Sequence, residues 1–432
     1  MSCVSRSVRR LLVVVAPLAG VAADAGSQAA LQGRPCRLVD QVSVTAVPLN
    51  GSTVHYAAPI VAAPLPDEGT LVAWSPSGGP VHLTRVNRAG TRTGGDALVP
   101  GTSAHALAVT PRGFAALIRR EPAAGLGAEL WLVEVDSSGN ALLERKLIGG
   151  TDTAVVGNEW FDAFARRGRL VWNGRWLSAY YTLHRRWPDG VAHQGDQLSH
   201  IAPNGVRLLG GWDWGCSHSL DLRLALRPTQ RGGTDMAAAC LSDAYPGKGI
   251  YVNRRARVSS EPSGDREGHS DARLGGLVPV ENGFWLNWTT PEGRASADVA
   301  LLPLDGGPNF RAYPQRRVWL TANEVAEDLP HLARFGDELL AAWREGGSVY
   351  RLARVDLNGN LIGASEVVEA QFGADDDFIT YAGGDVGWLH AWGARSELKL
   401  VRVRHCPPTG VSPRPPPPAD TWRVRIRRPA AR

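Results

Sequence analysis

The sequence lacks the compact motifs that mark the common catalytic folds. It contains no Gly-x-Ser-x-Gly elbow, no His-Glu-x-x-His pair, no Walker phosphate loop and no Cys-x-x-Cys pair. Each of these motifs places a nucleophile, a metal ion or a phosphate within a few residues. Their absence weighs against the commonest hydrolases, nucleotide enzymes and zinc proteases. It does not exclude a site assembled from single residues far apart in the chain.

Helical periodicity is also missing. No segment after residue 30 keeps a 3.6-residue apolar period for long, whereas 49 Gly and 30 Pro interrupt the whole length of the chain. The sequence therefore predicts an all-β protein.

Residues 328–368 contain the clearest structural unit, which reads as four short strands joined by three turns. The segments HLARF, ELLAAW, YRLARVD and ASEVV are separated by GD, REGGS and LNGN. Gly and Asn in these turns favour tight hairpins. A sheet of four strands cannot bury both faces alone, so it must stack on copies of itself. We interpret this unit as one β-propeller blade.

An apolar core strand like ELLAAW recurs along the chain, each time after a Gly or an acidic turn. The copies are residues 69–74, 113–118, 174–181, 234–241, 283–288, 337–343 and 385–392. Their spacing is that of propeller blades with variable loops. The sequence predicts a seven-bladed β-propeller over residues 36–406. Residues 184–197 and 244–271 are predicted to be surface insertions of blades three and four.

The last blade lacks a strand, because the chain after Cys406 is Pro-rich and cannot pair in a sheet. The alternating run VSVTAV (42–47) is expected to supply the outer strand and to close the ring as an N-terminal strand.

The first 25 residues predict a cleavable secretory signal. Three Arg precede an apolar run that ends in small residues. The run is short for a bilayer span, although an uncleaved anchor is the alternative. The predicted location is secreted, periplasmic or cell-surface, with no transmembrane span.

Cysteine is scarce, and removal of the signal would leave four of the five cysteines. Two disulfides are the simplest outcome in an exported protein, and we expect the pairs Cys36–Cys406 and Cys216–Cys240.

The net charge of +5 is concentrated at the two ends of the chain. Residues 1–25 carry three Arg and one Asp, and residues 411–432 carry six Arg and one Asp, which leaves the body slightly acidic. A basic nucleic-acid stripe on the body is therefore not expected. The Pro- and Arg-rich tail, residues 407–432, is predicted to be disordered.

The repeat pattern over residues 36–406 resembles secreted bacterial β-propeller proteins in general. It lacks the Trp-Asp ending of WD40 blades, the Gly-Gly pair of kelch blades and the Ser-x-Asp-x-Gly-x-Thr-Trp box of sialidases. The resemblance implies the fold, and no family's functional residues can be transferred to this chain.

Polar residues recur just before the predicted innermost strand of successive blades. They are His105, Glu159, Asp162, His218, Asp221, His269, Asp271, Asp328, His331 and Asp375–Asp377. In a propeller these residues would converge on one axial opening. His218, His269 and His331 are candidate ligands of a divalent metal, Ca²⁺ or Zn²⁺, with Asp328 or Asp376 as a catalytic general base. His105, Asp162 and Asp271 are candidate ligand-binding residues. The alternative is that these residues cap turns and bond to backbone.

Six Trp residues fall within blades three and four: Trp160, Trp172, Trp176, Trp187, Trp212 and Trp214. Sugar rings stack on exposed Trp faces, so Trp187 and Trp212 are candidate glycan-binding residues. The alternative is packing between blades, which we favour for Trp172 and Trp176.

Two functions of different classes are compatible with these patterns. The leading hypothesis is a monomeric binding protein that recognises a glycan or peptide on its loop face. The competing hypothesis is a metal-dependent hydrolase or lyase with its site in the axial funnel.

Overall fold

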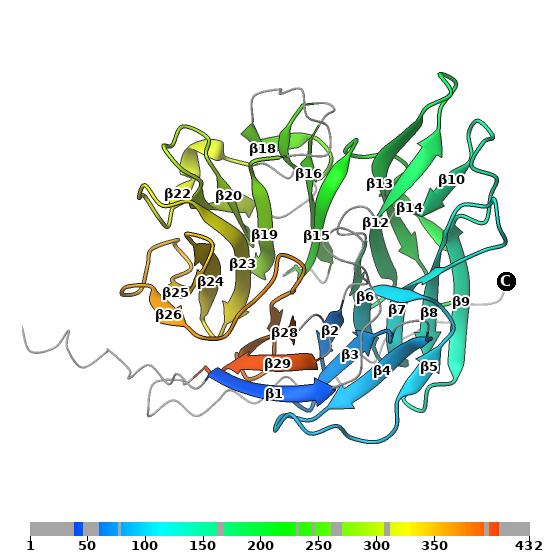
Figure 1. The fold of residues 1–432 in the computed structure, drawn as a ribbon, viewed down its shortest axis with the longest axis horizontal. Coiled ribbons are helices and arrows are strands. Elements are labelled where there is room, and N and C mark those ends of the chain that lie inside the picture. Colours follow the sequence, from blue (N-terminus) through cyan, green and yellow to red (C-terminus); the bar gives the residue numbers. More distant parts are fainter. Residues whose placement is uncertain are drawn as a thin grey trace, which may run out of the picture.

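The computed structural model describes residues 39–45, 60–76, 79–161, 168–229, 233–243, 247–260, 270–305, 312–392 and 397–405. Within these ranges the chain forms seven antiparallel sheets around a central axis (Figure 1). The fold is therefore a seven-bladed β-propeller, as the sequence predicted. The only described helical element is the 3-10 turn η2 (Pro314–Arg316), and no described helix has the length and hydropathy needed to cross a membrane.

The blades follow one another along the chain, and each strand pairs with the next. The innermost strands are β2 (Val61–Pro64), β6 (Ser103–Thr110), β11 (Gly168–Trp172), β15 (Ser219–Pro228), β19 (Arg273–Val280), β23 (Glu327–Phe335) and β27 (Ile379–Thr380). The second strands are β3 (Thr70–Trp74), β7 (Gly113–Arg120), β12 (Leu177–Arg186), β16 (Thr234–Ser242), β20 (Gly283–Thr290), β24 (Glu338–Glu345) and β28 (Val386–Trp392).

The outer half of each blade is a second hairpin. The third strands are β4 (Val81–Val86), β8 (Glu129–Val135), β13 (Ala192–Ile201), β17 (Gly249–Val252), β21 (Asp298–Asp305), β25 (Val349–Val355) and β29 (Glu397–Val403). The outer strands of blades one to six are β5 (Ala97–Val99), β9 (Ala141–Ile148), β14 (Arg207–Trp212), β18 (Ala256–Ser260), β22 (Val318–Trp319) and β26 (Glu366–Val368). In blade three, β10 (Glu159–Phe161) pairs with β12 in addition to β11.

Blade seven takes its outer strand from the other end of the described chain. Strand β1 (Val39–Thr45) pairs antiparallel with β29, from Val39 opposite Val403 to Thr45 opposite Leu398. Figure 1 shows β1 (blue) beside β29 (red-orange). The predicted signal segment, Cys36, Cys406 and the tail lie outside the described residues.

Apolar side chains on both faces of each sheet form the core. The second strands are the most enclosed, and every residue of β3 and of β20 is buried. The buried residues form seven apolar clusters within the described ranges, one between each pair of neighbouring blades. This packing explains why a single blade could not be stable alone.

The outer hairpins of blades two and six turn through an Asp-x-x-Gly sequence. The Asp136 carboxylate accepts hydrogen bonds from the backbone N–H groups of Ser138 and Asn140, and Gly139 has a φ of +90°. Asp356 and Gly359 repeat this geometry in blade six. The positive φ explains the glycine.

The two predicted surface insertions were partly wrong. Residues 184–186 and 192–197 extend the long β12–β13 hairpin, so only the turn at 187–191 is irregular in that segment. In the second segment, β17 and β18 are the third and outer strands of blade four. Both segments are rich in charged and polar residues, which conceals the strand pattern.

Candidate functional site

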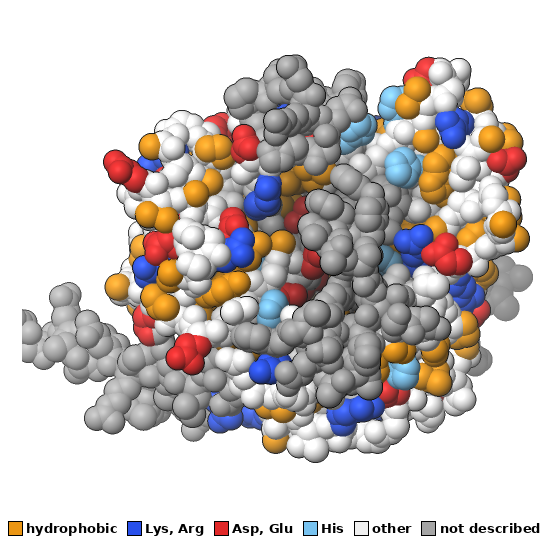
Figure 2. All heavy atoms as spheres, viewed as in Figure 1, with side chains coloured by type: hydrophobic (Ala, Val, Ile, Leu, Met, Phe, Trp, Pro, Cys, Tyr) orange, Lys and Arg blue, Asp and Glu red, His pale blue; other side chains and the backbone are white. Residues whose placement is uncertain are grey.

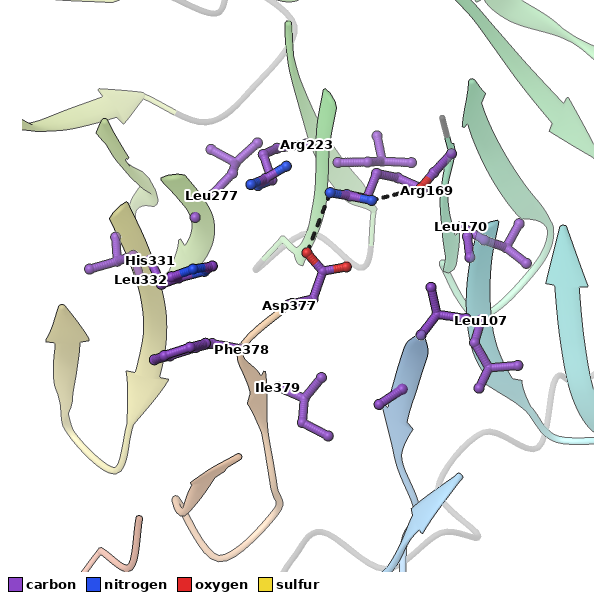
Figure 3. Close-up of a pocket in the computed structure, with 16 residues that line it drawn as sticks. Leu107, Arg169, Leu170, Arg223, Leu277, His331, Leu332, Asp377, Phe378 and Ile379 are labelled. Carbon is purple, nitrogen blue, oxygen red and sulfur yellow. Dashed lines mark hydrogen bonds and ion pairs between the residues drawn. The ribbon is translucent and has the colours of Figure 1, made fainter. Parts of the chain in front are cut away.

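A cavity of about 190 Å³ lies on the axis of the ring. All seven blades line it, because the innermost strands, or residues directly before them, form its wall. Much of the wall is aliphatic and includes Leu107, Leu170, Leu224, Leu277, Leu332 and Ile379. Four charged or titratable side chains interrupt this wall: Arg169, Arg223, His331 and Asp377 (Figure 3). In the sphere view, acidic side chains lie in the hollow at the centre of the face (Figure 2).

Irregular strand pairing near the axis decides which side chains reach this cavity. The pairing register shifts at Ala104/Ala106 in β6, Ser219/Asp221 in β15, Leu274/Leu277 in β19 and Asp328/His331 in β23. A bulge changes the face to which the following residues point. In β6, Ala106 and Leu107 line the cavity, whereas His105, at the irregularity, contacts the Phe161 ring edge-on at 4.7 Å.

Arg223, on β15, is buried, and each nitrogen of its guanidinium donates a hydrogen bond. Its Nη1 donates to Asp221 Oδ1 at 2.5 Å and to the carbonyl of Leu222 at 2.7 Å. Its Nε and Nη2 donate to the carbonyls of Gly275 and Leu274 in blade five. Arg223 therefore joins two blades and is held in a fixed position.

Arg169, on β11, faces the same cavity with fewer partners. Its Nη1 donates to the carbonyl of Gly168 at 2.8 Å, but Nε and Nη2 are buried and make no hydrogen bond. Nη2 lies 3.3 Å from Asp377 Oδ1 and 3.8 Å from Asp221 Oδ1. Figure 3 shows the side chains of Arg169 and Arg223 pointing toward each other, with Asp377 below Arg169.

The segment before β27 supplies the opposite wall. The Phe378 ring stacks on the His331 ring, with centroids 4.5 Å apart and planes 5° apart. His331 Nε2 lies 3.1 Å from the carbonyl oxygen of Gly373, and its own backbone carbonyl accepts from Asn287 Nδ2 at 2.9 Å. His331 is thus fixed between blades five, six and seven.

The two candidate general bases each have a close partner. Asp328 accepts two hydrogen bonds from Arg344, at 2.8 Å from Nε and 2.5 Å from Nη2. Asp376 Oδ2 lies 2.7 Å from His390 Nδ1 and accepts from the backbone N–H of Gly373. Burial raises the pKa of Asp376, against the lowering effect of His390. Neither carboxylate lines the axial cavity.

The remaining His and Asp candidates are dispersed. His105 Nε2 lies 2.7 Å from the Ser103 hydroxyl, and His218 Nδ1 lies 3.3 Å from the buried carboxylate of Asp243. Asp271 is exposed before β19. Asp162 and His269 lie outside the described residues. Of the described polar residues that were expected before the innermost strands, His331 and Asp377 line the cavity and the others do not.

One cluster in the described chain has the spacing of metal ligands: Asp196, Cys216 and Cys240. Cys216 and Cys240 form the predicted disulfide, so their sulfurs are not thiolate ligands. None of the histidines predicted as ligands belongs to this cluster. The three-histidine metal site stays a prediction, which elemental analysis of the wild type and of a His269→Ala, His331→Ala double variant would test.

The Trp candidates have separate environments. Trp212 Nε1 donates to Asp196 Oδ1 at 2.9 Å, which gives Trp212 an internal role. Trp187 meets Trp214 edge-on at 5.4 Å, and the Arg185 guanidinium lies 5.6 Å and 5.0 Å from these two rings. Both rings are partly exposed, so Trp187 keeps the geometry that stacking on a ligand requires.

Sequence reasoning missed the two arginines in the cavity wall. A signal was present, because Arg223 stands in Leu-Arg-Leu and Arg169 in Gly-Arg-Leu, each within a strand otherwise rich in apolar residues. A charged residue inside such a strand needs partners or a function.

No protein-family model and no curated protein matches the sequence. Among solved structures, the chain is similar to Kuenenia stuttgartiensis hydrazine synthase, with 13% identity, a TM-score of 0.48 and coverage of 82% of this chain and 98% of the other. It is also similar to a Penicillium chrysogenum α-L-arabinanase complexed with arabinobiose (10% identity, TM-score 0.44, coverage 85% and 98%). A third similar structure is the Fusarium graminearum GH93 α-L-arabinofuranosidase with arabinobiose, with 10% identity, a TM-score of 0.48 and coverage of 85% of this chain and 98% of the other. At these identities the likeness concerns the fold alone.

Proposed function

We propose that this chain is a binding protein, active outside the cytoplasm, that holds one end group of a peptide or glycan in the axial cavity. The observation that carries this proposal is the convergence of Arg169 and Asp377, from different blades, on a cavity with mainly aliphatic walls. Such a combination of apolar walls and a few placed charges is typical of small-ligand sites.

The size of the cavity favours an end group over a continuous chain. Its 190 Å³ is below the range of about 300–1,000 Å³ for drug-sized ligands. One side chain or one sugar ring is a suitable occupant.

One observation supports binding over hydrolysis, and another supports a location outside the cytoplasm. Asp328 is paired with Arg344, and Asp376 is paired with His390, so each candidate base is engaged outside the cavity. The buried Cys216–Cys240 disulfide supports an oxidising compartment.

The test is a screen of the purified wild type on peptide and glycan arrays, followed by solution binding. An Ala62→Phe variant fills the cavity from β2, and Ala141→Phe places the same ring on the exposed outer strand β9. We expect Ala62→Phe to weaken binding at least about tenfold and Ala141→Phe to leave it unchanged, with thermal denaturation verifying both folds. Unchanged binding in Ala62→Phe, or no ligand on either array, would contradict the proposal.

Trp187 provides a separate test of a glycan contact. If a glycan extends from the cavity to the β12–β13 hairpin, Trp187→Ala should weaken glycan binding without affecting peptide binding. Equal binding by this variant would exclude that hairpin from the interface.

A further inference from the structure

The guanidinium edge formed by Nε and Nη2 of Arg169 is unsatisfied inside the protein. The side chain is 14% exposed, and both atoms are buried without a hydrogen bond. Among the described arginines, only Arg169 has both atoms of this edge in that condition. A buried charged donor without an acceptor is costly. The Asp377 contact at 3.3 Å supplies charge but no aligned hydrogen bond.

In two other arginines of this chain, the same Nε and Nη2 edge of the guanidinium binds a carboxylate. Nε and Nη2 of Arg344 donate to the two oxygens of Asp328, and Nε and Nη2 of Arg354 donate to the two oxygens of Glu338. The two parallel N–H groups match the spacing of carboxylate oxygens, which gives a strong and directional pair.

Surrounding groups hold the Arg169 edge ready for such a pair. Arg223 fixes Asp221 at 2.5 Å, so the Asp221 carboxylate, 3.8 Å from Arg169, is already engaged. The Asp377 side chain is 33% exposed and comes from the segment before β27. A ligand carboxylate could take its place without disturbing a strand.

We propose that Arg169 is a carboxylate subsite, and that its ligand is the free C-terminus of a peptide ending in an aliphatic residue. This inference rests on the proposed binding role of the axial cavity. The carboxylate forms two hydrogen bonds with Nε and Nη2 and displaces Asp377. The last side chain packs against Leu107, Leu170 and Ile379.

The cavity wall favours a peptide end over a uronic acid, which carries the same carboxylate. A uronic acid ring has several hydroxyl groups that need hydrogen-bond partners when buried. The aliphatic wall offers few partners, and Arg223 is saturated. An aliphatic side chain has no such requirement.

The experiment compares N-acetyl-Ala-Leu, as a free acid and as its C-terminal amide, by calorimetry and thermal shift on the full-length protein. We expect the wild type to bind the acid about 10- to 100-fold more tightly, as two charge-assisted hydrogen bonds imply. Arg169→Gln should abolish this preference. Arg169→Lys should reduce it, because Lys keeps the positive charge but lacks the two parallel N–H groups of the guanidinium. Arg354→Gln, which breaks a matched arginine–carboxylate pair outside the cavity, should retain it.

Equal binding of acid and amide by the wild type, no saturable binding of the acid, or a preference that survives in Arg169→Gln would overturn the carboxylate subsite. Galacturonate is the second probe, and Arg169-dependent binding of galacturonate without binding of the peptide would overturn the peptide assignment. Loss of array binding in Ala62→Phe but not in Arg169→Gln would refute this subsite while leaving the proposed function intact.

A substitution of Asp377 should have the opposite effect on acid binding to a substitution of Arg169. Asp377→Asn removes the competing carboxylate, so it should strengthen binding of the free acid about fivefold without affecting the amide. Weaker binding of the acid would show that Asp377 assists the ligand instead of competing with it.

Discussion

The carboxylate of Asp196 lies wholly inside blade three, beside the Cys216–Cys240 disulfide. It accepts hydrogen bonds from Trp212 Nε1, from the Ser219 hydroxyl and from the backbone N–H of Cys216. Burial raises its pKa to about 6, although these hydrogen bonds oppose the rise. The stability of the fold should therefore depend on pH through ionisation of this carboxyl group.

We predict that stability falls as pH rises from about 4 to about 6. The pKa of an unfolded Asp is about 4, so in this window the unfolded chain binds fewer protons than the folded chain. The complete loss of folding free energy from ionisation of Asp196 is about 3 kcal/mol. Urea unfolding across this range should show the decline in the wild type and a smaller one in Asp196→Asn. The exposed control Asp337→Asn should follow the wild type, and identical slopes in all three proteins would contradict the assignment.

At this scale the sequence predicted residue types better than residue positions. His331 lies in the cavity wall, whereas Asp328 forms a pair with Arg344 outside it. Pattern alone could not separate them, because the register shift between Asp328 and His331 changes the direction of the side chains that follow. Arg169 was missed because the carboxylates close to it, those of Asp221 and Asp377, come from other blades.

At the scale of elements, the outer strand β1 is attached to the ring by a hydrogen-bonded edge and by the buried side chain of Val44. Val44 is 4% exposed and packs with Leu398 and Leu400 of β29, in the apolar cluster between blades seven and one. Gln41, on the same strand, is exposed.

Val44→Asp should therefore destabilise the protein by about 3 kcal/mol, since it buries a charge in an apolar cluster. Gln41→Asp should change the unfolding free energy by less than about 0.5 kcal/mol. Urea denaturation measures both values. Equal, small effects would mean that β1 does not pack in blade seven under solution conditions.

The sequence predicted long, apolar strands correctly and overlooked short or polar ones. Every second strand was recognised, because its residues are buried on both faces and read as an uninterrupted apolar run. Strands β17 and β18 were taken for an insertion, because each has only four or five residues and β18 includes charged Arg257. Strand β17 pairs with β16 and β18 pairs with β17, so both strands depend on a core strand that lies outside their own hairpin.

At the scale of the molecule, the described chain contains one disulfide, between Cys216 and Cys240. The Cys216–Cys240 disulfide is local in sequence and joins the segment just before β15 to strand β16. The pair Cys36–Cys406 is a prediction on residues outside the described ranges.

Mass mapping of the non-reduced, exported protein tests that pair. We expect one peptide pair linked through Cys216 and Cys240 and a second linked through Cys36 and Cys406. The second link would close nearly the whole chain into a loop, worth about 5 kcal/mol in the chain-entropy picture. A free thiol at Cys36 or Cys406 would contradict this expectation.

The pairing of β1 with β29 also dictates the order in which the protein can assemble. Blades one to six are each built from a contiguous segment, so each can pair its strands and pack on the preceding blade soon after its own residues are synthesised. Blade seven must wait for nearly the last described residues, which makes it the slow, high-contact-order step of folding. A circular permutant with new ends between β5 and β6 would make this blade contiguous, and should fold faster than the natural order while keeping the same ring.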